Sequence, residues 1–89
     1  MYSVHTTKLF EKDTIKLGKR GKDLVKLKLI INELAKGHVL QPKYKDHKLT
    51  GNYSGFKECH IEPDWLLIYK IEDGALFLTR TGTHSDLFS

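Results

Sequence analysis

The run Trp65-Leu66-Leu67-Ile68-Tyr69-Lys70-Ile71 decides the fold of this 89-residue chain. Its apolar side chains fall on both faces, which is typical of a strand in the centre of a sheet. Asp73-Gly74 follows, and this dipeptide strongly favours a tight hairpin turn into a strand over 75–81. A further strand over 55–61 precedes the run, separated from it by the turn residues 62–64. The sequence therefore predicts an antiparallel meander with residues 65–71 in its middle.

Two helices are expected before this meander. The first would begin at Thr6 or Thr7, whose hydroxyl can accept from the free N–H groups of the first turn. It would run to about Leu17 and bury three apolar residues, Leu9, Phe10 and Leu17. The second, over 22–36, is the clearest periodic element, because apolar residues recur at helical spacing at Leu24, Leu27, Ile31 and Leu34, and Val25 and Ile30 broaden this stripe.

A short strand at 2–5 and a loop at 38–52 complete the expected elements, and residues 85–89 would form a tail. The order is β-α-α-β-β-β, an antiparallel sheet with a helical hairpin packed on it, which is α+β architecture. Residues 1–89 provide for one domain. No apolar run approaches the roughly 20 residues that span a bilayer, no secretory signal is visible at the N-terminus, and one cysteine cannot form an internal disulfide. We therefore expect a cytoplasmic protein without a membrane segment.

Charge divides the chain into two unlike halves. Residues 1–48 carry twelve Lys and Arg against five Asp and Glu, whereas residues 49–89 carry three against six. A basic half of this kind favours a polyanionic partner, although a lysine-rich, solvated helix face would give the same composition.

Histidines and carboxylates gather at loops and strand ends of the C-terminal half. His47 precedes the meander, His60 lies near its first turn, and His84 follows its last strand. Asp64 lies in the first turn, and Glu58 shares a strand face with His60 because strand residues two apart point the same way. Whether the histidines meet in one pocket is not settled by the sequence.

Such a set suits RNA cleavage, because the 2′-OH of RNA is a nucleophile already beside its phosphate. Histidine titrates near neutrality and can move a proton in either direction. A carboxylate can hold an imidazole in one tautomer, and a cation such as Arg80 can neutralise phosphate oxygens by a bidentate contact. This chemistry requires neither a metal nor a cofactor.

Other interpretations remain open for these residues. Cys59, His60, Asp64 and His84 offer zinc ligands, but neighbouring Cys59 and His60 point to opposite strand faces and no zinc motif is present. Asp64 is also an ordinary turn residue, Trp65 an ordinary core residue, and Arg80 could be a simple surface charge. Phe88 could pack on the core or stack on a base. A non-catalytic RNA- or protein-binding module on the same scaffold is the alternative function.

Three segments in order resemble the YafQ-type mRNA interferase toxins of the RelE/ParE superfamily. They are Lys45-Asp46-His47-Lys48-Leu49-Thr50-Gly51, the stretch from Cys59-His60-Ile61-Glu62-Pro63-Asp64 through Tyr69, and Arg80-Thr81-Gly82-Thr83-His84-Ser85-Asp86-Leu87-Phe88. The resemblance implies a ribosome-dependent endoribonuclease that is held inactive by a cognate antitoxin, in a heterotetramer or larger complex that could bind operator DNA.

The resemblance also implies roles for single residues. His47, His60, Asp64 and His84 would be catalytic, with His84 moving a proton. Glu58 stands where the family commonly has a carboxylate, and would support catalysis. Arg80 would contact the scissile phosphate, while Trp65 and Phe88 would shape the pocket or stack on RNA. Ribosomal RNA would be the partner of a basic group in the helical half, Lys19, Arg20, Lys22, Lys26 and Lys28.

Overall fold

The computed structural model describes residues 1–88, and the predicted elements are all present in it. They are β1 (Ser3–Thr6), α1 (Lys8–Lys19), α2 (Leu24–Ala35), β3 (Lys57–Glu62), β4 (Trp65–Glu72), β5 (Ala75–Gly82) and α3 (His84–Phe88). The stretch expected to be a plain loop contains three short elements, the 3-10 helices η1 (Pro42–Tyr44) and η2 (Gly51–Tyr53) on either side of β2 (His47–Lys48). The expected C-terminal tail is helical as far as Phe88.

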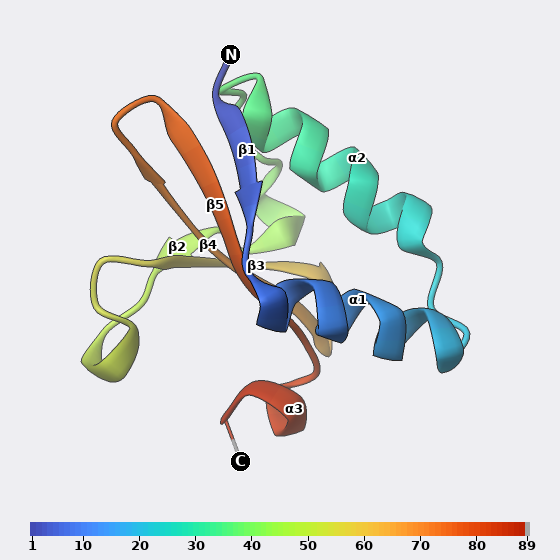
Figure 1. The fold of residues 1–89 in the computed structure, drawn as a ribbon. Helices are drawn as coiled ribbons and strands as arrows, with labels where there is room; N and C mark the ends of the chain where they lie inside the picture. Colours follow the sequence, from blue (N-terminus) through green and yellow to red (C-terminus); the bar gives the residue numbers. More distant parts are fainter. Residues whose placement is uncertain (89) are drawn as a thin grey trace.

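The sheet has the strand order β1-β5-β4-β3-β2, with the run that opens at Trp65 in its centre as predicted. Neighbouring strands from β2 to β5 are antiparallel, whereas β1 lies parallel to β5 at the edge. β1 lies beside β5, but along the chain α1 and α2 separate β1 from the other strands (Figure 1). Such a crossover is what a parallel pair requires. The α+β class is confirmed, and the predicted antiparallel sheet acquires one parallel edge strand.

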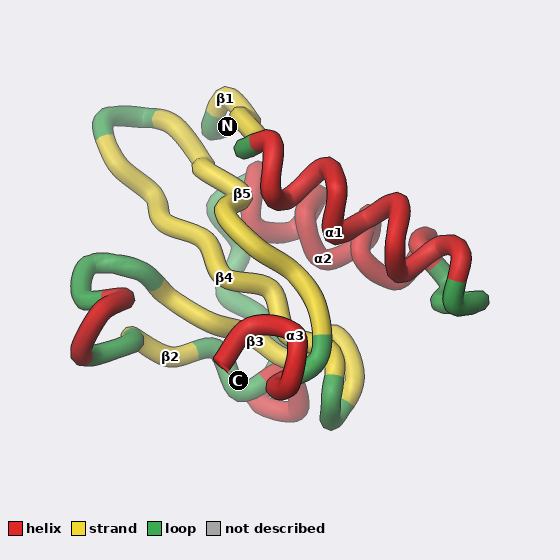
Figure 2. The backbone as a smooth tube through the Cα atoms, turned by 60° about the horizontal axis from the view of Figure 1, so that its bottom comes forward, coloured by secondary structure: helices red, strands yellow, loops and turns green. Residues whose placement is uncertain are grey.

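Helices α1 and α2 lie side by side over one face of the sheet (Figures 1 and 2). Thr7 caps α1 by accepting a hydrogen bond from the Phe10 N–H at 2.9 Å, and Asp23 caps α2 in the same manner through Val25 at 3.0 Å. The main core forms between these helices and the inward side chains of β3, β4 and β5, among them Trp65, Leu67 and Tyr69. None of the described helices is long and apolar enough to cross a membrane.

The helices face the core largely with the predicted apolar residues, and the exact angle of each stripe differs slightly. In α1, Phe10 and Leu17 are buried as predicted, Asp13 is buried beside them, and Leu9, expected to be buried, is 54% exposed. In α2 the buried positions are Leu27, Ile30, Leu34 and Ala35, while Leu24 and Ile31 are only partly covered. Apolar residues at several neighbouring positions left the angle of the stripe undetermined, and packing on the sheet selects one of the possible angles.

The opposite face of the sheet carries a smaller cluster. Leu66 and Ile68 of β4 pack there against Leu87 of α3, with Leu49, Tyr53 and Phe56 at its margin. This packing attaches the C-terminal helix to the sheet on the side away from α1 and α2. The candidate catalytic residues lie around this second face.

Candidate active site

The three C-terminal histidines come together, although they belong to β2, β3 and the first turn of α3. The ring centroids of His47 and His60 are 6.3 Å apart, and those of His60 and His84 are 5.8 Å apart. The short strand β2 explains the approach of His47, because it pairs His47 directly with Glu58 of β3. The predicted residues therefore form one continuous row, with His60 in the middle.

His84 is held by Asp64, which lies in the turn between β3 and β4. The Asp64 Oδ1 atom accepts from the His84 backbone N–H at 2.9 Å and lies 2.5 Å from His84 Nδ1. These two contacts, the backbone one first, lower the pKa of the Asp64 carboxyl. The carboxylate fixes Nδ1 as a donor, which leaves Nε2 of this half-exposed ring for proton exchange.

Glu58 is buried and lies between the other two histidines. Its Oε2 atom is 3.2 Å from His47 Nε2 and 3.6 Å from His60 Nε2. The other ring nitrogens also face oxygen acceptors, since His47 Nδ1 lies 2.6 Å from the Lys45 carbonyl and His60 Nδ1 lies 3.2 Å from the Pro63 carbonyl. Each ring has a backbone carbonyl oxygen near Nδ1 and the Glu58 carboxylate near Nε2. Glu58 therefore connects the two rings through a buried carboxylate.

The loop that carries His47 is anchored by its neighbour Asp46. The Tyr69 hydroxyl donates to Asp46 Oδ1 at 2.5 Å, and the Lys57 ammonium group contacts Oδ2 at 3.1 Å. Burial, followed by the contact with Asp46, raises the pKa of Tyr69, so this hydroxyl stays a donor. Lys45, whose carbonyl contacts the His47 ring, has the left-handed backbone conformation, with a φ of 48°. Asp46 thus anchors the loop that presents the candidate catalytic residue His47.

Arg80 has a different environment from the one predicted. It lies in a cross-sheet row with Ile68 and Glu58, so it shares their face, but its guanidinium binds the Asp13 carboxylate of α1 at 2.8 and 3.1 Å. Asp13 also accepts from the Thr81 backbone N–H at 3.1 Å. Arg80 therefore joins α1 to β5, and a contact with the scissile phosphate would have to use an N–H that Asp13 leaves free.

The two aromatic residues assigned to the pocket differ in position. Trp65 has no exposed surface, and its indole N–H donates to the Thr81 hydroxyl at 2.9 Å. A stacking role for Trp65 is therefore wrong, because a ring enclosed in the core cannot reach RNA. Phe88 is 48% exposed and contacts Tyr53 edge-to-face, with ring centroids 5.8 Å apart. Together they line a groove of about 470 Å³, where a base could stack.

The basic residues of the helical half are partly engaged within the protein. Arg20 binds Asp86 at 2.8 and 3.1 Å, and Lys22 and Lys26 each contact Glu62 at 2.8 Å. Exposed pairs of this kind are weak, so phosphates can compete for the two lysines. The sequence did not show that Arg20 also holds the helix that carries His84.

Asp86 and Asp13 are structural residues that sequence reasoning missed. Thr83 and Asp86 cap α3 reciprocally, because the Thr83 N–H donates to Asp86 at 3.0 Å and the Asp86 N–H to the Thr83 hydroxyl at 3.0 Å. The spacing Thr83-x-x-Asp86 is a capping-box pattern, and it could have revealed the helix. Asp13 leaves no comparable local signal, since its partners lie 67 and 68 residues away.

The zinc set considered from the sequence does not assemble. Cys59 is buried in the main core, and desolvation raises the pKa of its thiol to about 12, so it stays protonated. Among residues 1–88, no group of three or more His, Cys, Asp or Glu side chains is placed to hold a metal ion.

Comparison with known proteins connects this geometry to a family. The family model described as "Bacterial toxin of type II toxin-antitoxin system, YafQ" matches residues 2–89. The chain belongs to the YafQ toxin family. It is 45% identical over 80 residues to the mRNA interferase toxin YafQ of Escherichia coli K12, covering 89% of this chain and 87% of that protein.

Two solved toxin structures share the fold. The Escherichia coli DinJ-YafQ complex matches with a TM-score of 0.93 and 40% identity over 100% of both chains. A metal-bound toxin from Helicobacter pylori matches with a TM-score of 0.93 and 47% identity, over 99% of this chain and 100% of that one. The resemblance stated from three segments of sequence is therefore confirmed over nearly the whole chain.

Proposed function

We propose that this YafQ-family toxin is a ribosome-dependent endoribonuclease that cleaves mRNA by metal-independent acid/base catalysis. The observation that carries the proposal is the row of three histidines, with Glu58 bound between two of them and Asp64 bound to the third. The mRNA interferase activity named for the 45% identical Escherichia coli relative supports cleavage of mRNA.

In this mechanism the 2′-oxygen attacks the neighbouring phosphorus, a P–O bond forms, and the P–O5′ bond breaks. One side chain takes the 2′-OH proton and another donates a proton to the leaving 5′-oxygen. His84 is assigned one of these transfers, because Asp64 orients its ring and leaves Nε2 free. His47 and His60 bring positive charge to the phosphorane oxygens. The products are a 2′,3′-cyclic phosphate, which can open to a 3′-phosphate, and a 5′-OH.

End-group analysis of RNA cut by the purified protein on translating ribosomes tests the proposal directly. A 2′,3′-cyclic or 3′-phosphate with a 5′-OH is expected, together with growth arrest when the toxin is expressed alone. RNA that binds but is never cut would contradict the proposal and favour a non-catalytic binding module.

Chelation should leave cleavage unchanged, because in the proposed mechanism side chains move both protons. The metal-bound Helicobacter pylori relative makes this test necessary for the family. In this chain the space between His47 and His60 is occupied by the Glu58 carboxylate, and no suitable ligand group forms among residues 1–88. The measurement is cleavage of an isolated RNA with EDTA, since ribosomes need magnesium. Activity that disappears on chelation and returns with zinc would contradict a metal-free mechanism.

Neutralising Lys19, Lys22, Lys26 and Lys28 together should weaken ribosome binding and flatten its dependence on salt. The slope of log K against log salt should fall by about 0.7–0.9 for every phosphate that the variant no longer neutralises. Sedimentation with ribosomes over a range of salt concentrations measures the slope, and Lys36→Gln serves as a control for an exposed lysine at the other end of α2. An unchanged slope would assign the four lysines to a solvated helix face.

The proposed setting is the cytoplasm, with a cognate antitoxin as the protein partner. The Escherichia coli relative forms a complex with its antitoxin DinJ, which supports an equivalent complex here. A heterotetramer or larger assembly that binds operator DNA is the proposed form. Purification of the toxin with the product of an adjacent reading frame, followed by mass measurement, tests this assembly.

A further inference from the structure

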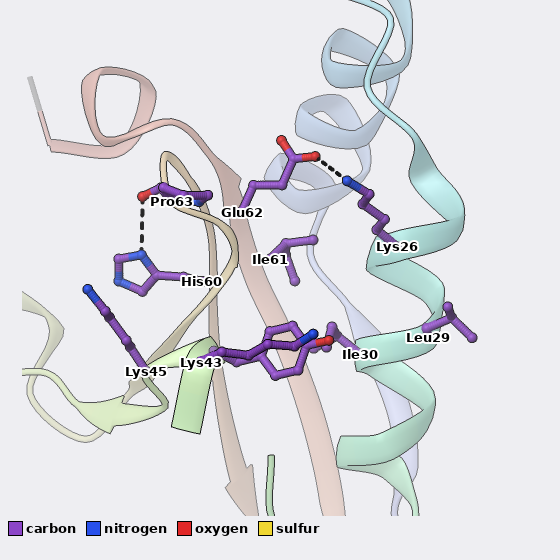
Figure 3. A pocket seen from close by; sticks show the side chains of 10 residues that line it. Lys26, Leu29, Ile30, Lys43, Lys45, His60, Ile61, Glu62 and Pro63 are labelled. Carbon is purple, nitrogen blue, oxygen red and sulfur yellow. Dashed lines mark hydrogen bonds and ion pairs between the residues drawn. The ribbon is translucent and has the colours of Figure 1, made fainter. Parts of the chain in front are cut away.

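A cavity of about 420 Å³ adjoins the histidine row. The proposed mechanism assigns no role to this cavity, and neither does the proposed binding of ribosomal RNA by the helix lysines. The cavity, called here the η1 pocket, lies between α2, η1 and the outer edge of β3 (Figure 3). It exists because β2 pairs only with Lys57 and Glu58, so the rest of that edge of β3 has no neighbouring strand. His60 borders both the pocket and the Glu58 cluster, and so connects them.

The walls of the η1 pocket combine apolar surface with positive charge. Ile30, Ile61 and the half-buried Tyr44 contribute apolar surface, and Leu29 extends it with a side chain that is 60% exposed. Three ammonium groups surround this surface, from Lys26, Lys43 and Lys45. In Figure 3 the Lys45 side chain extends toward the His60 ring, while Lys26 reaches Glu62 on the opposite wall.

The single carboxylate of the pocket is already neutralised. Glu62 contacts Lys22 and Lys26 at 2.8 Å each, and these contacts lower the pKa of its carboxyl. The register of β3 shifts between His60 and Glu62, which lets Glu62 turn to α2 while His60 faces Glu58. Lys43 and Lys45 form no ion pair within residues 1–88, and the Lys43 ammonium lies 5.1 Å from the Tyr44 ring centroid. The pocket therefore carries uncompensated positive charge beside an aromatic ring.

We propose that the η1 pocket binds the RNA nucleotide next to the cleaved phosphodiester, with its base on the Tyr44, Leu29 and Ile30 wall and its phosphate at Lys43 and Lys45. This inference rests on the proposed function. Pockets of roughly 300–1,000 Å³ suit ligands of nucleotide size, and an aromatic ring flanked by lysines is a common site for single-stranded nucleic acid. An acidic peptide would satisfy the lysines too, but continuity through His60 with the histidine row favours the RNA.

Binding of an uncleavable RNA tests the pocket separately from catalysis. The probe is an RNA trinucleotide of mixed sequence with 2′-O-methyl groups, which remove the nucleophile, and binding is followed by NMR of the full-length protein. The Leu29 and Ile30 methyl signals and the Tyr44 ring signals should shift saturably. In the double variant Lys43→Gln/Lys45→Gln the Kd should rise about tenfold at physiological salt, because two lysines no longer reach the phosphate. Lys36→Gln is the matched control, and Tyr44→Leu should weaken binding without changing its salt dependence.

Several outcomes would overturn the inference. Shifts confined to the three histidines would place the RNA elsewhere, and equal Kd values for the double variant and Lys36→Gln would exclude phosphate binding by Lys43 and Lys45. Pocket signals that respond to the antitoxin but never to RNA would make this a protein site. Wild-type protein that cuts RNA while the pocket signals stay unchanged would contradict this inference alone. Pocket binding without any cleavage would contradict the catalytic proposal alone.

Discussion

His84→Ala should slow single-turnover cleavage on the order of 10²–10⁴-fold, the range expected when a general acid or base is removed. The physical reason is local: Asp64 holds Nδ1, so the ring presents one nitrogen, Nε2, for proton exchange. The side chain is half exposed at the first position of α3 and contributes little to the core. Thermal stability should therefore change by only about 0.5 kcal/mol, as for most surface substitutions. Quenched-flow cleavage on ribosomes gives the rate, and thermal melting and ribosome pelleting show whether folding and binding persist.

His38→Ala is a matched control for this substitution. His38 also pairs with a carboxylate, Glu33 at 3.2 Å, but it lies near the C-terminal end of α2, outside the histidine row. His47→Ala and His60→Ala should slow cleavage less than His84→Ala if they mainly balance the phosphate charge. A His84 variant that cuts at the wild-type rate would exclude proton transfer by His84. Early melting together with failure to bind ribosomes would show instead that the residue is structural.

The meander could be predicted because each of its strands carries its own signal. An apolar run on both faces, a turn at residues 62–64 and the Asp73-Gly74 hairpin fix three neighbouring strands by local rules. The strand β2 has only two residues and no such pattern, yet it brings His47 to Glu58. Convergence of the histidines therefore depends on a pairing that local reasoning did not detect.

Positions that depend on distant partners were harder to predict. Trp65 begins a strand that is buried on both faces, so periodicity could not assign its ring to either side, and the structure encloses it beside Thr81. Arg80 looked free as a phosphate ligand because its partner Asp13 lies 67 residues earlier in the chain. The residue types of the site could be predicted, whereas their bonding depends on how α1 and α3 pack against the sheet.

Asp86→Asn should slow cleavage on the order of 10–10²-fold, although Asp86 lies outside the histidine row, because small displacements of a catalytic group are costly. Asp86 fixes the helix that carries His84 through three contacts. It binds Arg20 at 2.8 Å and Lys16 at 3.3 Å, and it accepts a hydrogen bond from the Thr83 N–H. Asparagine keeps an oxygen for the Thr83 N–H but lacks the charge that holds α1. Single-turnover rates for Asp86→Asn and for Glu72→Ala, a carboxylate paired with Lys70 away from α3, separate this effect from a general change in surface charge.

The same variant should reveal Asp86 through the pH dependence of stability. The Arg20 hydrogen bond, followed by the Thr83 N–H, lowers the pKa of folded Asp86 below the unfolded value of about 3.9. A lowered carboxyl pKa stabilises the folded protein fully above the unfolded value, and this stabilisation is lost as the pH falls through the folded value. Urea unfolding should therefore show a wild-type advantage over Asp86→Asn at neutral pH that shrinks as the pH falls below about 4. An advantage that stays constant with pH, together with an unchanged cleavage rate, would mean that the Arg20–Asp86 contact does not position His84.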